Sequence, residues 1–157
     1  RLFGEPLAAK LRERDEKQPL SACMKTRTRI LVVEDQPEML ELMVLALTRA
    51  GCEVKAAADG EEGLRQAETG RFDLISTDVD LPELNGFEIC SRLKQNPALR
   101  HTPVVIVSGR SGDDDLQRGR ELGAADYITK PFDLLNYVSR LLSHVEFTPL
   151  EKGLRHE

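Results

Sequence analysis

From residue 28 onward the chain alternates short apolar runs with amphipathic segments, and this alternation is the strongest limit on its fold. The apolar runs are TRILVV, CEVKAAA, FDLIST, PVVIVS and ADYIT, and each precedes a segment whose apolar residues recur at helical spacing. Strands that alternate with helices are joined by right-handed crossovers, which makes the sheet parallel and covers both of its faces. The sequence therefore predicts a doubly wound α/β fold of five strand–helix units.

The amphipathic segments carry recognisable helix signals. The first ends at Gly51, the second follows a capping residue at Asp59, and the fourth opens on the acidic run at residues 113–115, where negative charge favours the helix dipole. The last segment, residues 133–145, is predicted to bury one apolar face. The residues placed on that face are Leu134, Leu135, Val138, Leu141, Leu142 and Val145.

The alternation leaves both ends of the chain outside the predicted domain, which spans residues 28–145. Residues 1–27 are rich in charge and poor in large apolar groups, so we expect a linker or an extraneous segment there, within which residues 6–17 could form a short helix. Because residue 1 is not Met, the chain is either cut from something longer or starts naturally at Met24. Residues 146–157 form a tail too short for a DNA-binding domain.

Charge and cysteine content exclude several classes of protein. Lys plus Arg number 22 and Asp plus Glu 27, a net charge of −5, which does not favour nonspecific binding to nucleic acid or anionic membranes. The sequence holds no apolar run of membrane-spanning length, and its three cysteines are far apart, which argues against a disulfide framework or a zinc site. We expect a soluble protein in a reducing cytoplasm.

Polar residues follow four of the five predicted strands at the point where each strand ends. Glu34 and Asp35 follow the first strand, Asp78 the third, Ser108 the fourth and Lys130 the fifth. In a parallel sheet these ends share one edge, which is where ligands bind. Three acids, a hydroxyl and an amine are therefore predicted to converge.

Each of these residues also has a plainer interpretation. Asp35 could cap the first helix, Asp78 and Ser108 could be turn residues, and Lys130 could be a solvated charge. Together they favour chemistry instead, because carboxylates held close repel, and a divalent cation with oxygen ligands, Mg²⁺ above all, relieves the repulsion. A carboxylate in that setting can act as a nucleophile on phosphorus, while a cation and a hydroxyl stabilise the phosphoryl oxygens.

Four motifs, in order, resemble those of one family. They are ILVVEDQP, FDLISTDVDLPELNGFE, VVIVSG and GAADYITKPF. With them, residues 28–145 resemble a receiver domain of the two-component response-regulator family. The resemblance implies a flavodoxin-like fold with strand order 2-1-3-4-5, and a signalling phosphoacceptor that phosphorylates and dephosphorylates only itself. It also implies a cis peptide bond between Lys130 and Pro131.

The resemblance assigns the acidic residues. It implies that Asp78 accepts a phosphoryl group from a histidine of a sensor kinase or of a histidine phosphotransfer protein. It implies that Mg²⁺ is held by Glu34, Asp35 and Asp78, with the backbone carbonyl of Asp80 as a further ligand. Asp78 is thus both the phosphorylation site and a metal ligand.

The remaining site residues also receive roles from the resemblance. Ser108 and Lys130 match the hydroxyl and the cation that meet the phosphoryl group, and Gly109 leaves room for the donor histidine. Tyr127 matches the switch aromatic that turns inward when Ser108 engages the phosphate, although packing in the core is its plainer role. The family often signals through the face of the fourth helix, fifth strand and fifth helix, so an output partner or a homodimer is expected there.

The acidic residue after the phosphoacceptor raises a separate hypothesis. Asp80 and Arg110 lie two residues beyond Asp78 and Ser108 respectively, at positions that influence the access of hydrolytic water in the family. We expect them to pair across the mouth of the site and to slow loss of the phosphoryl group.

Two alternatives compete with the receiver interpretation. The sequence DVD resembles the D-x-D motif of haloacid-dehalogenase-type magnesium-dependent phosphatases, but there the motif follows the first strand and the acidic pair comes after the lysine. Here the pair precedes Asp78, which follows the third predicted strand. The second alternative is a binding module of the same fold that is not phosphorylated, which is disfavoured because each position of the site is filled. The sequence does not choose between a single-domain receiver and one cut from a larger regulator or hybrid kinase.

Overall fold

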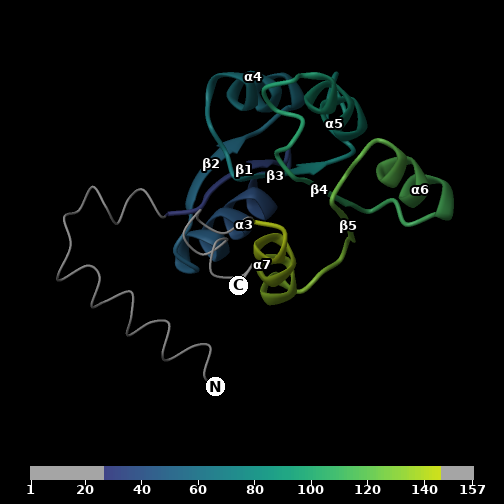
Figure 1. The fold of residues 1–157 in the computed structure, drawn as a ribbon. Helices are drawn as coiled ribbons and strands as arrows, with labels where there is room; N and C mark the ends of the chain where they lie inside the picture. The colour runs from purple at the N-terminus through teal and green to yellow at the C-terminus, as the bar shows by residue number, and fades with distance from the viewer. Residues whose placement is uncertain (1–26, 146–157) are drawn as a thin grey trace, which may run out of the picture. The chain divides into compact units, whose positions relative to one another are not determined.

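Five parallel strands form one sheet in the order β2-β1-β3-β4-β5, as predicted (Figure 1). The computed structural model describes residues 27–145. The strands are β1 (Arg29–Val33), β2 (Glu53–Ala57), β3 (Leu74–Asp78), β4 (Val104–Ser108) and β5 (Asp126–Thr129). The chain order reverses at β1, which pairs with both β2 and β3, so β1 and β3 end side by side at the same edge.

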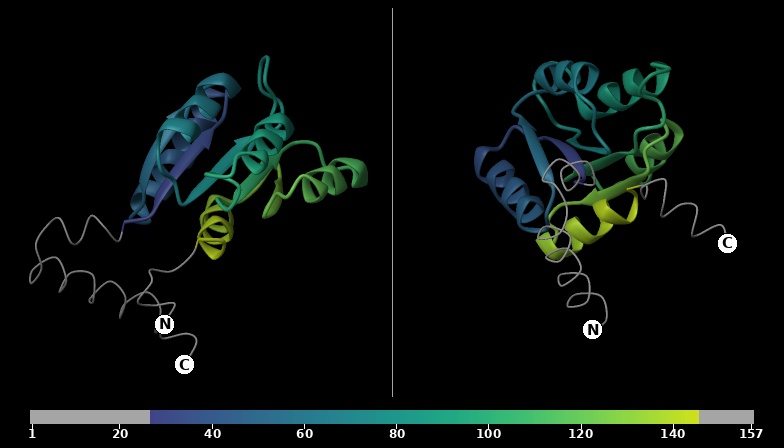
Figure 2. Two further views of the ribbon diagram at one scale, coloured as in Figure 1. Left: turned by 45° about the horizontal axis from the view of Figure 1, so that its top comes forward. Right: turned by 60° about the vertical axis from the view of Figure 1, so that its left-hand side comes forward.

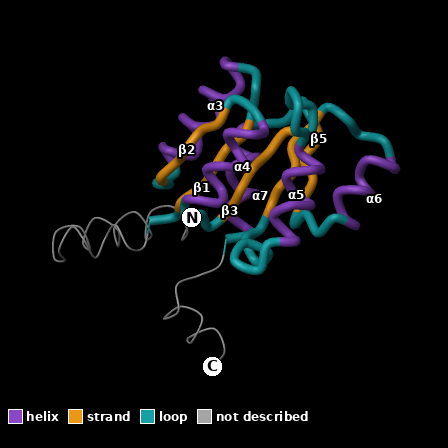
Figure 3. The backbone as a smooth tube through the Cα atoms, turned by 90° about the horizontal axis from the view of Figure 1, so that it is seen from above, coloured by secondary structure: helices purple, strands orange, loops and turns teal. Residues whose placement is uncertain are grey.

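Helices cover both faces of the sheet (Figures 1 and 2). They are α3 (Pro37–Arg49), α4 (Gly60–Thr69), α5 (Gly86–Gln95), α6 (Asp113–Glu121) and α7 (Leu134–Ser143). Side chains of α3 and α7 share one apolar cluster with the sheet, whereas those of α4 and α5 share another on the opposite face. Figure 3 views the sheet from the α4 and α5 side, with the strands running beneath these helices.

Burial follows the position of each strand in the sheet. All five residues of β3 and of β4 are buried, while the edge strand β2 exposes two of its five. This is the pattern expected when central parallel strands are covered on both sides. The site residues at the ends of β3 and β4 therefore project from the most deeply buried strands of the sheet.

The helix signals in the sequence are confirmed. Asp59 caps α4, accepting a hydrogen bond from the backbone of Glu62 at 2.8 Å. Gly51 and Gly123 follow α3 and α6 with φ of 97° and 93°, a left-handed conformation that glycine adopts without a steric penalty. The acidic run occupies the first turn of α6.

The buried face of α7 differs from the prediction at two positions. Leu135, expected to be buried, is 80% exposed, and Tyr137, which was not assigned to that face, is fully buried. Because successive helical residues are about 100° apart, residues 135 and 137 lie on nearly opposite sides of the helix. The prediction for Leu135 was wrong because a leucine was weighted by its hydropathy and not by its angular position.

Other predictions concern residues that the structure does not describe. The short helix suggested for residues 6–17 and the tail at residues 146–157 lie outside the described range. Between residues 27 and 145, no helix is both long enough and apolar enough to cross a membrane.

Candidate functional site

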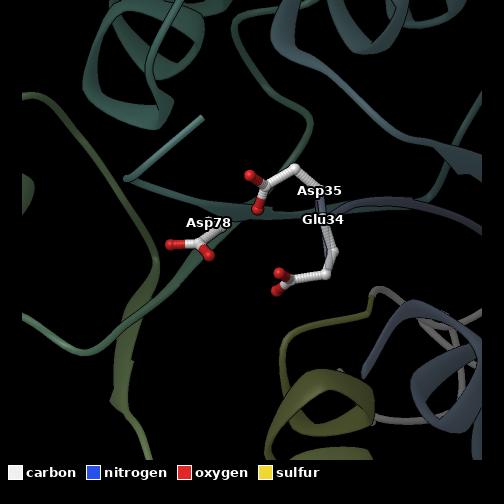
Figure 4. Close-up of side chains that lie close together, drawn as sticks. All are labelled: Glu34, Asp35 and Asp78. Carbon is white, nitrogen blue, oxygen red and sulfur yellow. The ribbon is translucent and has the colours of Figure 1, made fainter. Parts of the chain in front are cut away.

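Three carboxylates meet at the carboxyl ends of β1 and β3. Glu34 and Asp35 directly follow β1, and Asp78 is the last residue of β3. One carboxylate oxygen from each residue lies within 4.8 Å of the others (Figure 4). Glu34 and Asp78 are buried, at 0% and 5% exposure, whereas Asp35 is exposed. The convergence predicted from the strand ends is therefore present.

The plainer interpretation of Asp35 as a helix cap is wrong. The N-cap of α3 is Gln36, Pro37 opens the helix, and within the described residues the Gln36 side chain makes no capping hydrogen bond. The backbone N–H of Gln36 instead donates to Glu34 Oε2 at 3.2 Å. The turn after β1 thus orients the glutamate, and it leaves the Asp35 carboxylate among the three that converge.

Lys130 connects two of the buried acids. Its Nζ donates to Asp78 Oδ2 at 2.8 Å and to Glu34 Oε1 at 3.0 Å. Its backbone N–H donates to the carbonyl of Ser108 at 2.8 Å, which fixes the start of the loop after β5 against β4. The peptide bond between Lys130 and Pro131 is cis, as the resemblance implied.

The electrostatics of the site follow from this burial and pairing. Burial raises the pKa of Glu34 above its ordinary value, and the hydrogen bond from Lys130 offsets this in part. Burial lowers the pKa of Lys130, but its hydrogen bonds with Asp78 and Glu34 outweigh that effect and leave the pKa raised. Lys130 is therefore charged at neutral pH, and its ammonium contacts two of the three carboxyl groups of the cluster.

The donor set fits a hard divalent cation. Carboxylate oxygens in this number are the ligands that Mg²⁺ prefers, and the exposed side of Asp35 leaves an approach for a hydrated ion. A second positive charge beside Lys130 would also relieve the repulsion between Asp78 and Glu34. The chemistry of these residues is thus compatible with a magnesium site.

Ser108 is the last residue of β4, the strand next to β3, and Arg110 lies in the loop that follows it. β3 and β4 pair in parallel, with Asp78 opposite Val107, so fully buried Ser108 lies one residue further along the neighbouring strand. Its Oγ accepts a hydrogen bond from the backbone N–H of Arg110 at 3.0 Å. Ser108 therefore ends the strand next to the one that ends in Asp78.

Asp80 and Arg110 form the ion pair that the sequence suggested. The guanidinium Nη2 and Nε lie 2.8 Å and 2.9 Å from Asp80 Oδ1, and both side chains are 52% exposed. The hydrogen bond with Asp80 raises the pKa of Arg110. The backbone N–H of Asp80 points the other way and donates to Asp78 Oδ1 at 3.1 Å. The pair spans the loops that follow β3 and β4, at the solvent side of the site.

Tyr127 is anchored to the same loop. Its hydroxyl donates to the carbonyl of Arg110 at 2.8 Å, and its ring packs beside Gly119, Phe87 and Ile106. Burial raises the pKa of the phenol. Arg110 thus contacts Asp80 with its side chain, and Ser108 and Tyr127 with its backbone, so the three are linked through one residue.

Sequence reasoning missed a polar contact beneath the site. Ser76 of β3 and Tyr137 of α7 are both fully buried and their hydroxyl oxygens lie 2.9 Å apart. Ser76 precedes Asp78 by two residues and therefore lies on the same face of β3. A serine and a threonine inside a predicted buried strand were the available signal, since buried hydroxyls require partners.

Comparison with known proteins gives the same family at each level. The family described as "Response regulator receiver domain" matches residues 30–142. The transcriptional regulatory protein TcrA of Mycobacterium tuberculosis is 40% identical over 124 residues, which cover 78% of this chain and 48% of that protein. The chain spans about half the length of such relatives.

Solved structures agree with the sequence matches. A putative response regulator from Chloroflexus aurantiacus superposes with a TM-score of 0.71 at 33% identity, covering 75% of this chain and 97% of that one. The signal receiver domain of a signal transduction histidine kinase from Syntrophus aciditrophicus superposes with a TM-score of 0.68 at 38% identity, covering 77% and 94%. These matches favour neither the phosphatase nor the non-phosphorylated module. With its strand order and its family match in agreement, the chain belongs to the response regulator receiver domain family.

Proposed function

We propose that this domain is the phosphoacceptor of a two-component phosphorelay, and that Asp78 receives the phosphoryl group from a sensor histidine kinase or a histidine phosphotransfer protein. The observation that carries the proposal is the contact of Lys130 with Asp78 at 2.8 Å, inside a cluster of three carboxylates. A purely structural ion pair needs one acid for each base. Two acids contact one lysine and a third carboxylate lies within 4.8 Å of both, which supports a site for a further cation.

Glu34, Asp35 and Asp78 would hold Mg²⁺ through their side chains and Asp80 through its backbone carbonyl. When bound, the ion would neutralise negative charge on the phosphoryl oxygens. The cluster of oxygen atoms supports this assignment. No side chain other than these carboxylates is required for it.

Group transfer then needs few protein atoms. A carboxylate oxygen of Asp78 attacks phosphorus, the new O–P bond forms as the P–N bond to the donor imidazole breaks, and the electron pair returns to the imidazole nitrogen. Lys130 and Ser108 would stabilise the equatorial oxygens. At Gly109, no described atom lies within 4 Å of where a Cβ would stand, which leaves space for the donor.

The switch would involve Ser108 and Tyr127. When Ser108 turns to the phosphoryl group, the backbone of Arg110 would lose its hydrogen bond to that hydroxyl, and the Arg110 carbonyl that accepts from the Tyr127 hydroxyl would be free to move. Tyr127 lies on β5 between α6 and α7, so its rotation would change the α6-β5-α7 face. We propose this face as the contact for an output partner or a homodimer.

The Asp80–Arg110 pair would tune how long the phosphoryl group lasts. The two residues pair in the loops that follow β3 and β4, and in this proposal their pairing would restrict the approach of a hydrolytic water to Asp78. The dephosphorylation rates of Arg110→Ala and Asp80→Ala, compared with that of the wild type, test this role.

The scope of the proposal follows the predicted domain. Residues 28–145 would be the receiver, with residues 1–27 a linker or extraneous segment and residues 146–157 a tail. The domain would act in the cytoplasm, without direct contact with nucleic acid or membrane, and its only chemistry would be its own phosphorylation and dephosphorylation. Its relatives include transcriptional regulators and a histidine kinase receiver, so the output remains open between these two kinds of protein.

One experiment tests the central proposal. The chain is incubated with Mg²⁺ and acetyl phosphate, and intact mass is followed. We expect one base-labile phosphoryl adduct in the wild type, and none in Asp78→Asn. The matched control is Asp114→Asn, an exposed acid of α6, which should form the adduct at the wild-type rate. A wild type that forms no adduct, or a D78N variant that forms it equally well, would overturn the proposal.

A further inference from the structure

A hydrogen bond between α7 and β3 crosses the apolar layer that separates the sheet from the α3 and α7 helices. Tyr137 on α7 donates its phenolic O–H to Ser76 on β3 at 2.9 Å, and both residues are fully buried. The other buried members of this cluster are aliphatic or carry sulfur: Ile30, Val32, Met43, Leu47, Cys52, Leu74, Val105, Val107, Ile128 and Leu141. A directional contact therefore stands inside a layer that is otherwise held by nondirectional packing.

Ser76 lies directly beneath the acidic cluster. It precedes Asp78 by two residues on the same face of β3, and it is paired with Val32, which precedes Glu34 by two residues on β1. Among the described residues, the buried polar side chains are Glu34, Ser76, Thr77, Asp78 and Ser108. All of them lie at the carboxyl ends of the central strands or in the two positions before Asp78, so Ser76 extends the polar site one step into the core.

The surroundings of Tyr137 keep its phenol protonated. Burial raises the pKa of Tyr137 well above its usual range, the hydrogen bond with Ser76 works against this, and the Glu34 carboxylate raises the pKa further. The phenol is therefore neutral and serves as a fixed hydrogen-bond donor.

The ring of Tyr137 makes a second contact with a site-bearing segment. It stacks on Phe132, with ring centroids 5.2 Å apart and an interplanar angle of 29°. Phe132 follows Lys130 by two residues, and Lys130 donates to Asp78 at 2.8 Å. Tyr137 thus contacts the strand that carries the phosphoacceptor and the loop that carries its lysine.

We propose that Tyr137 is a positioning residue for phosphorylation, holding Asp78 through Ser76 and Lys130 through Phe132 so that the two meet in a reactive arrangement. This inference rests on the proposed function of Asp78. A Phe–Ala pair would fill nearly the same volume with little loss of packing, but it would remove the hydrogen bond that joins α7 to β3, whereas the Arg140–Asp126 pair joins α7 to β5. Hydrogen bonds restrict such freedom because their energy depends on distance and angle.

The test compares single and double removal of the two hydroxyls. Tyr137→Phe leaves Ser76 without its donor, and Ser76→Ala leaves the phenol without its acceptor, so each single variant should be less stable than the wild type. The double variant Y137F/S76A has no orphaned hydroxyl and should recover most of the lost stability. Denaturant midpoints followed by circular dichroism report this.

Phosphorylation should not recover with stability. We expect the initial rate of adduct formation from acetyl phosphate at saturating Mg²⁺ to fall about tenfold in Y137F and to stay low in the double variant. This loss of rate is about an order of magnitude smaller than the loss caused by a 1 Å misplacement of a reacting group. A double variant that phosphorylates at the wild-type rate would overturn the proposal. If neither the wild type nor any variant formed an adduct, the proposed function itself would fail.

A packing control separates positioning from general softening. Leu141→Val removes one methylene from the same helix and the same buried layer, and it leaves Ser76 and Phe132 untouched. This variant should lose stability and still phosphorylate at the wild-type rate. A loss of rate in L141V equal to that in Y137F would mean that any defect in the layer slows the reaction, which contradicts a specific role for Tyr137.

Discussion

Two basic side chains contact acids beside the end of β3, and their surroundings differ. Lys130 contacts Asp78 and Glu34 with side-chain exposures of 19%, 6% and 0%, whereas Arg110 and Asp80 are each 52% exposed. The buried group lost most of its hydration on folding and depends on its partners for compensation, while the exposed pair exchanges readily with water. The same kind of contact is therefore expected to contribute much to stability at Lys130 and little at Arg110.

The largest effect should come from removing the buried cation. Lys130→Met leaves two buried acids without their shared donor, so we expect the free energy of unfolding without Mg²⁺ to fall by about 3 kcal/mol at neutral pH. Because Glu34 already has a raised pKa, protonation at lower pH should recover part of the loss. Chemical denaturation at two pH values measures both.

The matched control for this change is Lys55→Met, which removes an exposed lysine from the edge strand β2. That variant should remain within about 0.5 kcal/mol of the wild type. Equal stability of K130M and K55M would contradict the view that the contacts of Lys130 compensate for the hydration that Asp78 and Glu34 lose on folding.

A slightly smaller effect should come from Mg²⁺. If the ion binds the carboxylate cluster of the folded protein alone, Mg²⁺ at a hundred times its dissociation constant should stabilise the domain by about 2.7 kcal/mol. Asp35→Asn should abolish most of this gain and change the metal-free stability little, because Asp35 is exposed. Unfolding in the presence of increasing Mg²⁺ provides the measurement, and an equal gain in both proteins would remove Asp35 from the proposed ligands.

The ion pairs of Asp126 are less exposed than the Asp80–Arg110 pair and more exposed than the contacts of Lys130. Asp126 on β5 accepts from Arg140 at 2.5 Å and lies 3.0 Å from His144 Nε2, and its side chain is 20% exposed. Burial raises the pKa of Asp126, but the hydrogen bonds from Arg140 and His144 outweigh it, so the pKa falls below its ordinary value of 3.8. Its position between the two extremes predicts an intermediate effect on stability.

We expect Asp126→Asn to cost about 1 kcal/mol at neutral pH. Since the folded pKa is depressed, the stabilisation is fully present above the ordinary value of 3.8 and is lost as pH falls through the lowered pKa. The unfolding free energies of wild type and D126N should therefore converge in acid. A difference that stays constant from neutral pH to about pH 3 would show that packing, and not ionisation, is responsible.

Much of the fold and part of the site were predictable from particular residues. The sheet and its helices were predictable because hydrophobic period and glycine positions act locally, and the convergence of Glu34, Asp78, Ser108 and Lys130 followed because parallel strands share their carboxyl edge. The specific strand order came from the family resemblance and not from the pattern.

What was missed depends on contacts between distant segments. Ser76 and Tyr137 are 61 residues apart, and nothing local to either indicates that they would meet. The error at Leu135 has a local origin, since hydropathy ranks leucine above tyrosine although position 137 and not position 135 faces the core. The alternative cap at Asp35 failed because Pro37 starts α3 one residue later than that motif requires.

The smallest effect on stability should accompany a clear effect on kinetics. Arg110→Ala and Asp80→Ala break an exposed pair, so each should change the free energy of unfolding by less than about 0.5 kcal/mol. If the pair restricts the approach of water to Asp78, both variants should lose the phosphoryl group faster than the wild type, by a similar factor, since either substitution opens the same pair.

Decay of the phosphorylated mass after the donor is removed measures the rate, with Arg92→Ala, an exposed arginine of α5, as the control. Decay at the wild-type rate in both variants would leave the pair without a kinetic role. Faster decay in R110A alone would show that the Arg110 guanidinium acts without its ion pair to Asp80.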